Sequence, residues 1–255
     1  MKFSVCTDAV FAGVDTVSAM RACKTLGFDA IEFWSWENKD MEAIRQAREE
    51  LGMTVVTFCT QYSILNDARE HDRYLEGLAR SIEWAKRLDT KLLISQVGQS
   101  NDLSDAEQKQ HVIDGLKRCV PLLEEAGITL AIEPLNTRVD HPGYFMASSD
   151  LAADIINQVG SPHVQILYDF YHQQVTEGDI FRRSEALIDR IGHVHIAGNP
   201  GRMEPDRGEI DLGHLLAHLD RIAYDGYVGL EYQPQDPVEI GLMQLREFGG
   251  SSNNE

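Results

Sequence analysis

Short apolar runs typical of β-strands alternate with longer helical patterns along the chain, and this alternation limits the possible folds more than any other feature. The apolar runs, about eight in number, lie at residues 2–8, 29–34, 54–60, 91–98, 128–136, 164–172, 193–198 and 227–234. They recur at roughly 30-residue intervals, the length of one strand–helix unit. Strands this apolar are typical of a parallel sheet that is covered on both faces.

The stretches between these runs show helical periodicity. They lie near residues 14–26, 41–51, 70–88, 105–126, from a Ser-Ser-Asp cap to about 159, 179–190, 212–223 and 238–248. In the stretch 105–126, apolar side chains recur at i, i+4, i+7, i+8 and i+11, namely Val112, Leu116, Cys119, Val120 and Leu123. Such a stripe indicates a helix with one face against a core.

Right-handed crossovers between parallel strands leave two main architectures, an open doubly wound sheet and a closed barrel. The number and even spacing of the units favour a single (β/α)8 barrel, the TIM barrel, which we expect to span residues 1–248. We expect residues 249–255 to form a flexible tail. No G-x-G-x-x-G follows a strand and no G-x-x-x-x-G-K-[ST] occurs, so the nucleotide-binding sheets lack their usual motifs.

Charge and cysteine content limit the class of partner. With 23 basic and 41 acidic residues the net charge is −18, so we expect no nucleic-acid partner, because this surface would repel phosphate. No apolar run reaches 18 residues, so we expect no membrane span. The start MKFSVCTDAV reads as a strand rather than a signal peptide, and the four cysteines are scattered without a C-x-x-C pair. These features predict a cytoplasmic protein with reduced core cysteines.

Metal-competent side chains end four successive buried strands. They are Glu133 in AIEPLN, Asp169 in LYDFYH, His195 in HVHIAG and Glu231 in GLEYQP. In a parallel barrel such residues lie at similar depth on adjacent strands, at the end where active sites form. Three buried carboxylates would repel one another without a counter-ion. The sequence therefore predicts one divalent cation held by these four residues, Mg²⁺ or Mn²⁺ in preference to Co²⁺ or Zn²⁺.

Other polar residues follow the same strands. Asn136 and His172 lie three residues beyond Glu133 and Asp169, and we expect both to bind substrate. In the loop GNPGRMEPDRGEI, we expect Arg202, Glu204 and Arg207 to bind substrate, with an arginine forking onto a carboxylate or phosphate; a loop salt-bridge network is the alternative.

Two tryptophans and two further polar residues lie near the predicted strand ends. Trp34 follows the second strand, and we expect it to line the substrate pocket; Glu32 and Trp36 are further candidates, with core packing as the alternative for both tryptophans. His193 is interpreted as a hydrogen-bonded core histidine.

At these residues the sequence resembles the xylose-isomerase-like sugar isomerase/epimerase superfamily, and within it the hydroxypyruvate isomerase family. The matching segments are IEPLN, LYDFYH, HVHIAG, PGRMEP followed by GEI, and GYVGLEYQP. The resemblance implies a (β/α)8 barrel in which the four residues above hold one divalent cation and Glu133 and Glu231 shuttle protons. His172 matches a substrate-contacting histidine of ketose epimerases, and Arg202 and Glu204 match a polar loop of hydroxypyruvate isomerases.

The chain departs from that family at two places. Hydroxypyruvate isomerases commonly carry Gln where this chain has His195, whereas ketose epimerases carry His. The segment TFCTQYSILNDAREHDRY is short and different from the extended Asn-Ala-Gly-type loop that the family often shows after the third strand.

The resemblance and the polar strand ends together predict an isomerase of a small hydroxy-keto acid, interconverting hydroxypyruvate and tartronate semialdehyde or acting on a related oxo-tetronate. The reaction would pass through an enediolate, with Glu133 and Glu231 as the acid and base. A ketose 3-epimerase, a lyase (dehydratase or decarboxylase) of 3-oxo sugar acids and a non-catalytic sugar-binding barrel are the alternatives. The expected partner is a small hydroxy-carbonyl compound; a homo-oligomer is compatible with the sequence, which locates no interface.

Overall fold

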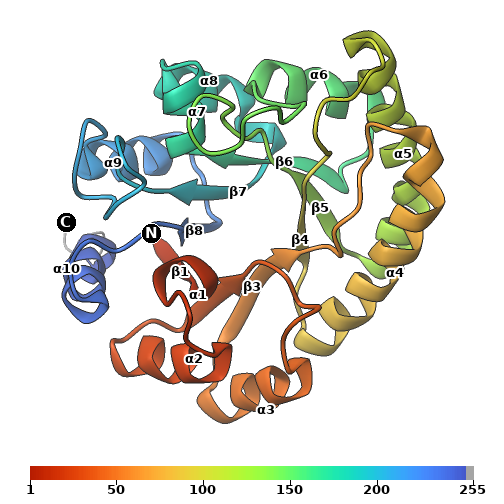
Figure 1. Cartoon of the computed structure of the whole chain (residues 1–255). Coiled ribbons are helices and arrows are strands. Elements are labelled where there is room, and N and C mark those ends of the chain that lie inside the picture. The colour runs from red at the N-terminus through yellow and green to blue at the C-terminus, as the bar shows by residue number, and fades with distance from the viewer. Residues whose placement is uncertain (251–255) are drawn as a thin grey trace.

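Eight parallel strands close into a barrel in chain order in the computed structural model, which describes residues 1–250 (Figure 1). The strands are β1 (Lys2–Cys6), β2 (Ala30–Phe33), β3 (Thr54–Cys59), β4 (Leu92–Ser95), β5 (Thr129–Ile132), β6 (Val164–Asp169), β7 (Ile191–Ile196) and β8 (Tyr227–Leu230). The closing pair is β1 and β8, in which Lys2 lies opposite Tyr227. The predicted (β/α)8 barrel is therefore confirmed.

Helices surround this barrel (Figure 1). They are α1 (Thr7–Val10), α2 (Thr16–Thr25), α3 (Met41–Leu51), α4 (His71–Leu88), α5 (Asp105–Ala126), α6 (Ser149–Val159), α7 (Phe170–Thr176), α8 (Ile180–Leu187), α9 (Leu212–Arg221) and α10 (Val238–Gly250), with short 3₁₀ turns at Ala68–Glu70 and Ile188–Arg190. The first residues of the tail expected from residue 249 belong to α10, and the rest of that tail lies outside the described residues.

Two strands end earlier than the sequence patterns indicate. The run 164–172 leaves the sheet at Asp169, because the Asp169 side chain accepts hydrogen bonds from the first amides of α7 and starts that helix. The run 128–136 leaves the sheet at Ile132, shortly before Pro134, which has no amide hydrogen to donate to a neighbouring strand. Both shortened strands leave polar residues just beyond the sheet, above the barrel interior.

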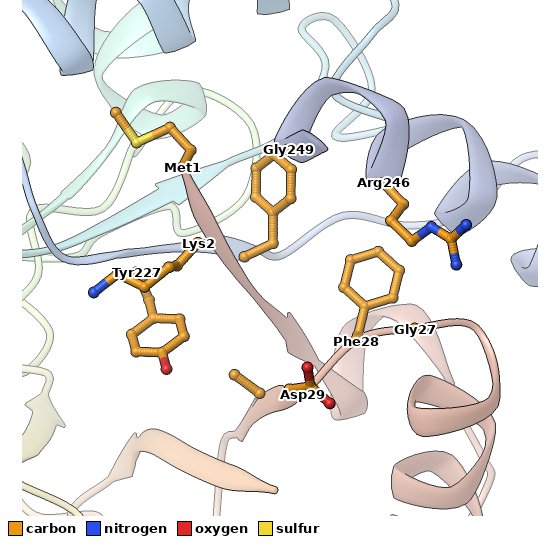
Figure 2. A pocket seen from close by; sticks show the side chains of 10 residues that line it. Met1, Lys2, Gly27, Phe28, Asp29, Tyr227, Arg246 and Gly249 are labelled. Carbon is orange, nitrogen blue, oxygen red and sulfur yellow. The ribbon is translucent and has the colours of Figure 1, made fainter. Parts of the chain in front are cut away.

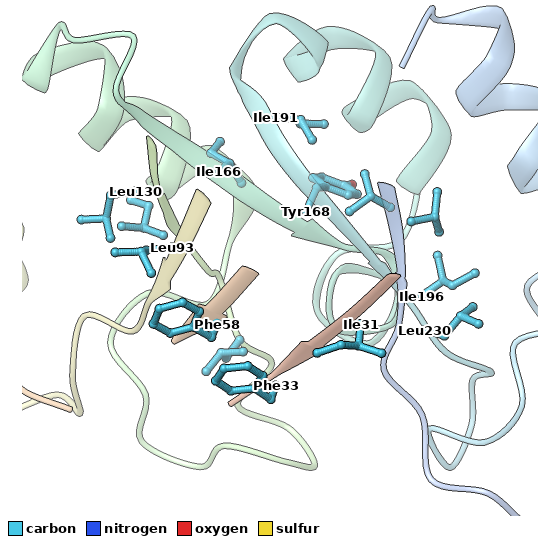
Figure 3. Packing of buried hydrophobic residues seen from close by; sticks show 14 of the residues in the cluster. Ile31, Phe33, Phe58, Leu93, Leu130, Ile166, Tyr168, Ile191, Ile196 and Leu230 are labelled. Carbon is cyan, nitrogen blue, oxygen red and sulfur yellow. The ribbon is translucent and has the colours of Figure 1, made fainter. Parts of the chain in front are cut away.

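The two faces of the barrel wall bury different sets of side chains. The outer face packs against the helices through the large apolar cluster of Figure 3, where the rings of Phe33 and Phe58 stack with centroids 5.2 Å apart. Inside the barrel lies a small separate cluster: Cys59, Ile94, Ala131 and Leu167. Because side chains alternate along a strand, Ala131 on the inner face places Glu133 inside as well.

The helix ends explain why the sequence folds locally as it does. Ser104 and Glu107 form a reciprocal capping box at the start of α5. Gly127 ends the same helix in the left-handed conformation that glycine adopts without strain.

All four cysteines are free and buried. Among the described residues, no helix is long and apolar enough to cross a membrane.

Candidate active site

The four residues that the sequence marks as metal-competent meet at the carboxyl end of the barrel. One ligand atom from each of Glu133, Asp169, His195 and Glu231 lies within 4.8 Å of the others, and all four residues are buried. Asp169 and His195 are direct neighbours across the β6–β7 pair. Parallel pairing therefore brings together residues that are far apart in the chain.

A cavity of about 280 Å³ lies over this cluster. Its lining comes from the ends of six strands and the loops that follow them: Trp34, Cys59, Ile94, Gln96, Glu133, Leu135, His141, His195, Arg202 and Glu231. The lining combines a few charged and polar side chains with apolar ones, which is the usual composition of a small-molecule site.

The two side-chain oxygens of Asp169 differ: one accepts hydrogen bonds and the other has no partner. Its Oδ1 accepts hydrogen bonds from the amides of Tyr171 (2.8 Å) and His172 (3.3 Å) at the start of α7. Its Oδ2 is buried without a hydrogen-bond partner. Burial raises the pKa of Asp169, and the nearby charge of Arg202 opposes this rise.

Glu231 is surrounded by donors. The indole Nε1 of Trp34 donates to Oε1 at 2.5 Å, while Arg202 donates to Oε2 and His195 Nδ1 lies 3.3 Å from Oε2. Burial would raise the pKa of Glu231, but the charges of Arg202 and His195 outweigh this and hold the pKa well below its usual range. These neighbours therefore favour the charged form of Glu231.

Glu133 has the opposite surroundings. Its Oε1 is buried without a hydrogen-bond partner. Burial, reinforced by the negative charge of Glu231, raises the pKa of Glu133 well above its usual range. The pKa values of two glutamates in one cavity are thus shifted in opposite directions, an arrangement that acid–base chemistry uses.

His195 is held from behind by a second buried carboxylate. Its Nε2 lies 2.7 Å from Glu32 Oε1, so its Nδ1 faces Glu231 and Glu133. The other oxygen of Glu32 accepts hydrogen bonds from Ser4 Oγ (2.9 Å) and His193 Nε2 (2.8 Å). Burial would raise the pKa of Glu32, but the two histidines lower it to about 2.

Gly229 makes room for this contact. A Cβ atom at position 229 would lie 2.5 Å from both Glu32 Oε1 and His195 Cδ2, closer than real Cβ atoms approach. The side chains of Glu32 and His195 meet where a side chain at position 229 would begin. Glycine is therefore the residue that fits there without displacing them.

The donor set fits a hard divalent cation. Three of its four residues have a buried atom without a hydrogen-bond partner, namely Glu133 Oε1, Asp169 Oδ2 and His195 Nδ1. Buried polar atoms are normally paired, so three such atoms within one cluster indicate a missing partner. Carboxylate oxygens with one imidazole are suitable ligands for Mg²⁺ or Mn²⁺, and the contact between His195 and Glu32 matches the carboxylate–histidine support common at metal sites.

Two expected substrate-binding residues lie behind the cluster rather than in the cavity lining. Asn136 Nδ2 donates to His172 Nδ1 at 2.6 Å, and both residues are fully buried. His172 Nε2 lies 3.6 Å from Asp169 Oδ2. His172 thus lies behind Asp169, with no hydrogen bond between the two side chains.

The residues expected from the loop after β7 divide into two groups. Arg202 lies in the cavity lining. Glu204 is buried outside the cavity and accepts hydrogen bonds from the amides of Gln235 (2.9 Å) and Asp236 (3.0 Å). Arg207 donates to Asp236. Both Glu204 and Arg207 thus tie this loop to the segment after β8, as in the salt-bridge alternative.

The tryptophans also separate. Trp34 lines the cavity, as expected, and donates to Glu231. Trp36 donates to Ser81 Oγ at 3.0 Å and packs against the core. His193 is a hydrogen-bonded core histidine, as interpreted from the sequence.

Sequence reasoning missed Gln96 and His141 as cavity residues. Gln96 directly follows β4, so the strand-end rule that found the other residues would have found it. His141 lies in the long segment between β5 and α6, where no periodicity indicates which side chains point inward. The contact of Glu32 with His195 joins β2 to β7 and has no signal in the sequence.

The fold and the site agree with three comparisons. Residues 20–248 match the model of the family described as xylose isomerase-like TIM barrel. The chain is 29% identical to a hydroxypyruvate isomerase of Escherichia coli, covering 97% of this chain and 99% of that protein. It is 30% identical to a 2-oxo-tetronate isomerase of Pectobacterium atrosepticum, covering 94% and 95%.

A solved structure extends the agreement to the backbone. The crystal structure described as an AP endonuclease, family 2, from Brucella melitensis matches with a TM-score of 0.92 at 27% identity, covering 96% of this chain and 98% of that one. The family match spans most of the sequence and includes all four residues of the carboxylate–histidine cluster. The chain therefore belongs to the xylose isomerase-like TIM barrel family.

Proposed function

We propose that the protein is a divalent-cation-dependent isomerase of a small hydroxy-keto acid, of the kind represented by hydroxypyruvate or a 2-oxo-tetronate. The observation that carries the proposal is geometric: Glu133, Asp169, His195 and Glu231 bring ligand atoms within 4.8 Å of one another beside one cavity. The names of the relatives supply the substrate class. The cavity of about 280 Å³ has room for a small substrate.

The cation would be held by the carboxylates of Glu133, Asp169 and Glu231 and by Nδ1 of His195. When bound, it supplies Lewis-acid stabilisation of the negative charge that develops on the substrate oxygens. Glu32 fixes the orientation of His195 for this purpose, and His172 lies behind Asp169.

Glu231 is the base, because it lines the cavity and its neighbours favour the charged carboxylate. It takes the proton from the carbon that carries the hydroxyl group, and the bond electrons move into the enediolate. Glu133, the second carboxyl group of the cavity, passes a proton to the neighbouring carbon, and the proton that Glu231 has taken replaces it. The substrate's hydroxyl proton passes to the former carbonyl oxygen, so the product is an isomer and no atom is gained or lost.

The substrate carboxylate would pair with Arg202. This residue supplies the guanidinium of the cavity lining. A guanidinium binds a carboxylate through two parallel hydrogen bonds. Glu204 and Arg207 act on the substrate indirectly, by fixing the loop that carries Arg202. Trp34 both closes the cavity and holds Glu231.

Proton NMR in D₂O tests this proposal. The protein is incubated with hydroxypyruvate, oxo-tetronates or free ketoses, with Mg²⁺ or Mn²⁺ and then with EDTA. We expect EDTA-sensitive deuterium uptake on the carbon next to the carbonyl of a keto acid, together with its isomer. Uptake that EDTA leaves unchanged, or no uptake on any acid by protein shown to hold the cation, would contradict the proposal.

A ketose 3-epimerase is the second candidate, and the histidine at position 195 favours it, since ketose epimerases carry His at this place. The same base would then remove the proton, and the acid would return it to the opposite face of the same carbon. Free ketoses in the same panel distinguish the two: an epimerase gives the epimeric ketose and leaves the keto acids unchanged.

A further inference from the structure

The guanidinium of Arg202 lies among the groups that would bind the cation. Its Nη2 donates to Glu231 Oε2 and lies 3.8 Å from Asp169 Oδ2. Glu231 Oε2 also faces Nδ1 of His195 at 3.3 Å. Arg202 therefore approaches two of the carboxylates that make up the candidate cation site, and neutralises part of their charge.

This position leaves one buried N–H donor of the arginine without a hydrogen-bond partner. Its Nε is buried and has no hydrogen-bond partner, although an arginine has five N–H donors to satisfy. A fully committed structural arginine in a buried site would normally pair most of them. The guanidinium carbon also lies 5.6 Å from the centre of the Tyr171 ring, and the Nε–H is left for another acceptor.

The backbone that carries Arg202 is fixed, so any movement belongs to the side chain. Arg202 has a left-handed backbone conformation, with φ of 53°. Backbone hydrogen bonds hold the loop at and next to this residue. Its carbonyl accepts a hydrogen bond from the amide of Gln233 at 2.7 Å, and the neighbouring Met203 bridges to Gly198. A non-glycine residue stays in this conformation only where its surroundings hold it there.

A divalent cation and this guanidinium cannot both keep these contacts at low cost. The cation would lie roughly 2.0–2.6 Å from each carboxylate oxygen that binds it. Two positive groups on the same buried oxygen repel strongly, because the effective dielectric constant is low there. The cation carries two charges and approaches the carboxylate oxygens more closely than a guanidinium does. Its electrostatic attraction to the three carboxylates is therefore the stronger.

We propose that Arg202 is an exchangeable counter-ion: it occupies the carboxylate cluster in the cation-free protein, and cation binding releases its guanidinium into the cavity to bind the substrate carboxylate. The inference rests on the proposed function and extends it to an order of events. Cation binds first and creates the anion-binding group, so cation and acid strengthen each other's binding by an equal factor.

Calorimetric titration with Mn²⁺ tests the competition, with no need for turnover. We expect Arg202→Met to bind Mn²⁺ about tenfold more tightly than the wild type or better, because the competing charged hydrogen bond is gone. Arg246→Met is the matched control: it removes a guanidinium at the amino end of the barrel, where Arg246 donates to the carbonyl of Leu26. Its Mn²⁺ affinity should equal that of the wild type.

The side chain itself can be followed in the unmodified protein. Arginine-selective ¹⁵N NMR, with the Arg202 signal assigned by its loss in Arg202→Met, should show the Nε–H resonance of Arg202 shift when Mg²⁺ is added and shift again on adding glycerate, an unreactive hydroxy acid. The Nε–H resonance of Arg207 should stay in place. If Arg202→Met does not fold, this readout is made on the wild type, with Arg202→Lys supplying the assignment.

The outcomes separate the two claims. Wild-type protein that binds no divalent cation contradicts the proposed function itself. Cation binding with equal or weaker affinity in Arg202→Met overturns the counter-ion inference and leaves the proposed function standing, as does an Arg202 resonance that does not respond to Mg²⁺.

Discussion

The barrel has a cavity at each end, and the two differ in size and chemistry. The cavity at the amino end is the larger, about 420 Å³ against about 280 Å³. Figure 2 shows its lining, where Lys2, Asp29 and Arg246 point in different directions. The nearest partner of Arg246 is the carbonyl of Leu26, at 3.0 Å. Asp29 pairs with Lys24 at the surface. Arg246 and Asp29 thus have separate partners and do not share one cluster.

The smaller cavity at the carboxyl end has three buried carboxylates and a histidine within 4.8 Å of one another. Burying such groups without partners is costly, so a chain keeps them where they have a use. The comparison teaches that convergence of buried polar atoms marks the site, and that volume does not. Substitutions at the two ends should therefore have very different consequences for activity.

The largest expected difference is between the two glutamates and the amino-end arginine. Glu133→Gln or Glu231→Gln should lower the turnover of the keto acid by about 10³-fold or more, because each removes a proton-transfer group and a cation ligand. Arg246→Ala, at the larger cavity, should leave turnover within about twofold. A glutamate variant that keeps a tenth of wild-type turnover would break the comparison.

Removing the support behind His195 should weaken cation binding without touching the cavity. Glu32→Gln should reduce Mn²⁺ affinity by about 10- to 100-fold, the usual effect of losing a carboxylate behind a metal-bound histidine. Calorimetric titration measures it. Asp29→Asn is the matched control, since it neutralises one carboxylate next to β2 at the amino end of the barrel. Equal affinities in the two variants would show that Glu32 does not position His195.

Glu32 also makes the cation-free protein sensitive to acid. Its folded-state pKa of about 2 lies below the ordinary value of 4.5, so its contribution to stability is complete above pH 4.5 and is lost as the pH falls toward 2. That contribution is on the order of 3 kcal/mol. Urea unfolding in EDTA should show a steeper loss of stability over this range in the wild type than in Glu32→Gln; parallel curves would contradict the assignment.

The smallest expected effect concerns the tryptophan at the cavity mouth. Trp34→Phe removes one donor from Glu231 and keeps most of the ring, so kcat/KM should fall about tenfold. Tyr227→Phe removes a hydroxyl at the other cavity and should change kcat/KM by less than twofold. Steady-state kinetics on both variants measures the contrast, and similar losses would show that the donor to Glu231 is unimportant.

The predictable part of the site is the part that the strand ends determine. Glu133, Asp169, His195 and Glu231 each follow or end an apolar run, and strand order alone places them at one end of a parallel barrel. The positions of Glu204 and Arg207 were not predictable in this way, because loop contacts decide whether a polar side chain faces the cavity or Asp236.

The same limit applies to the fold. The alternation of apolar runs and helical periods predicted the barrel and most helices. It could not place the end of β6, which depends on the side chain of Asp169 accepting a hydrogen bond from the amide of Tyr171. Nor could it reveal the contact between Glu32 and His195, because side-chain pairs across the barrel leave no periodic pattern in the sequence.

The central claim is that one divalent cation lies between Glu133, Asp169, His195 and Glu231. Anomalous diffraction from crystals grown with Mn²⁺ tests it most directly. The account predicts one strong peak in the smaller cavity, within roughly 2.0–2.6 Å of the carboxylate oxygens and of His195 Nδ1. No peak there in crystals that contain manganese, or a peak at the amino-end cavity instead, would contradict it.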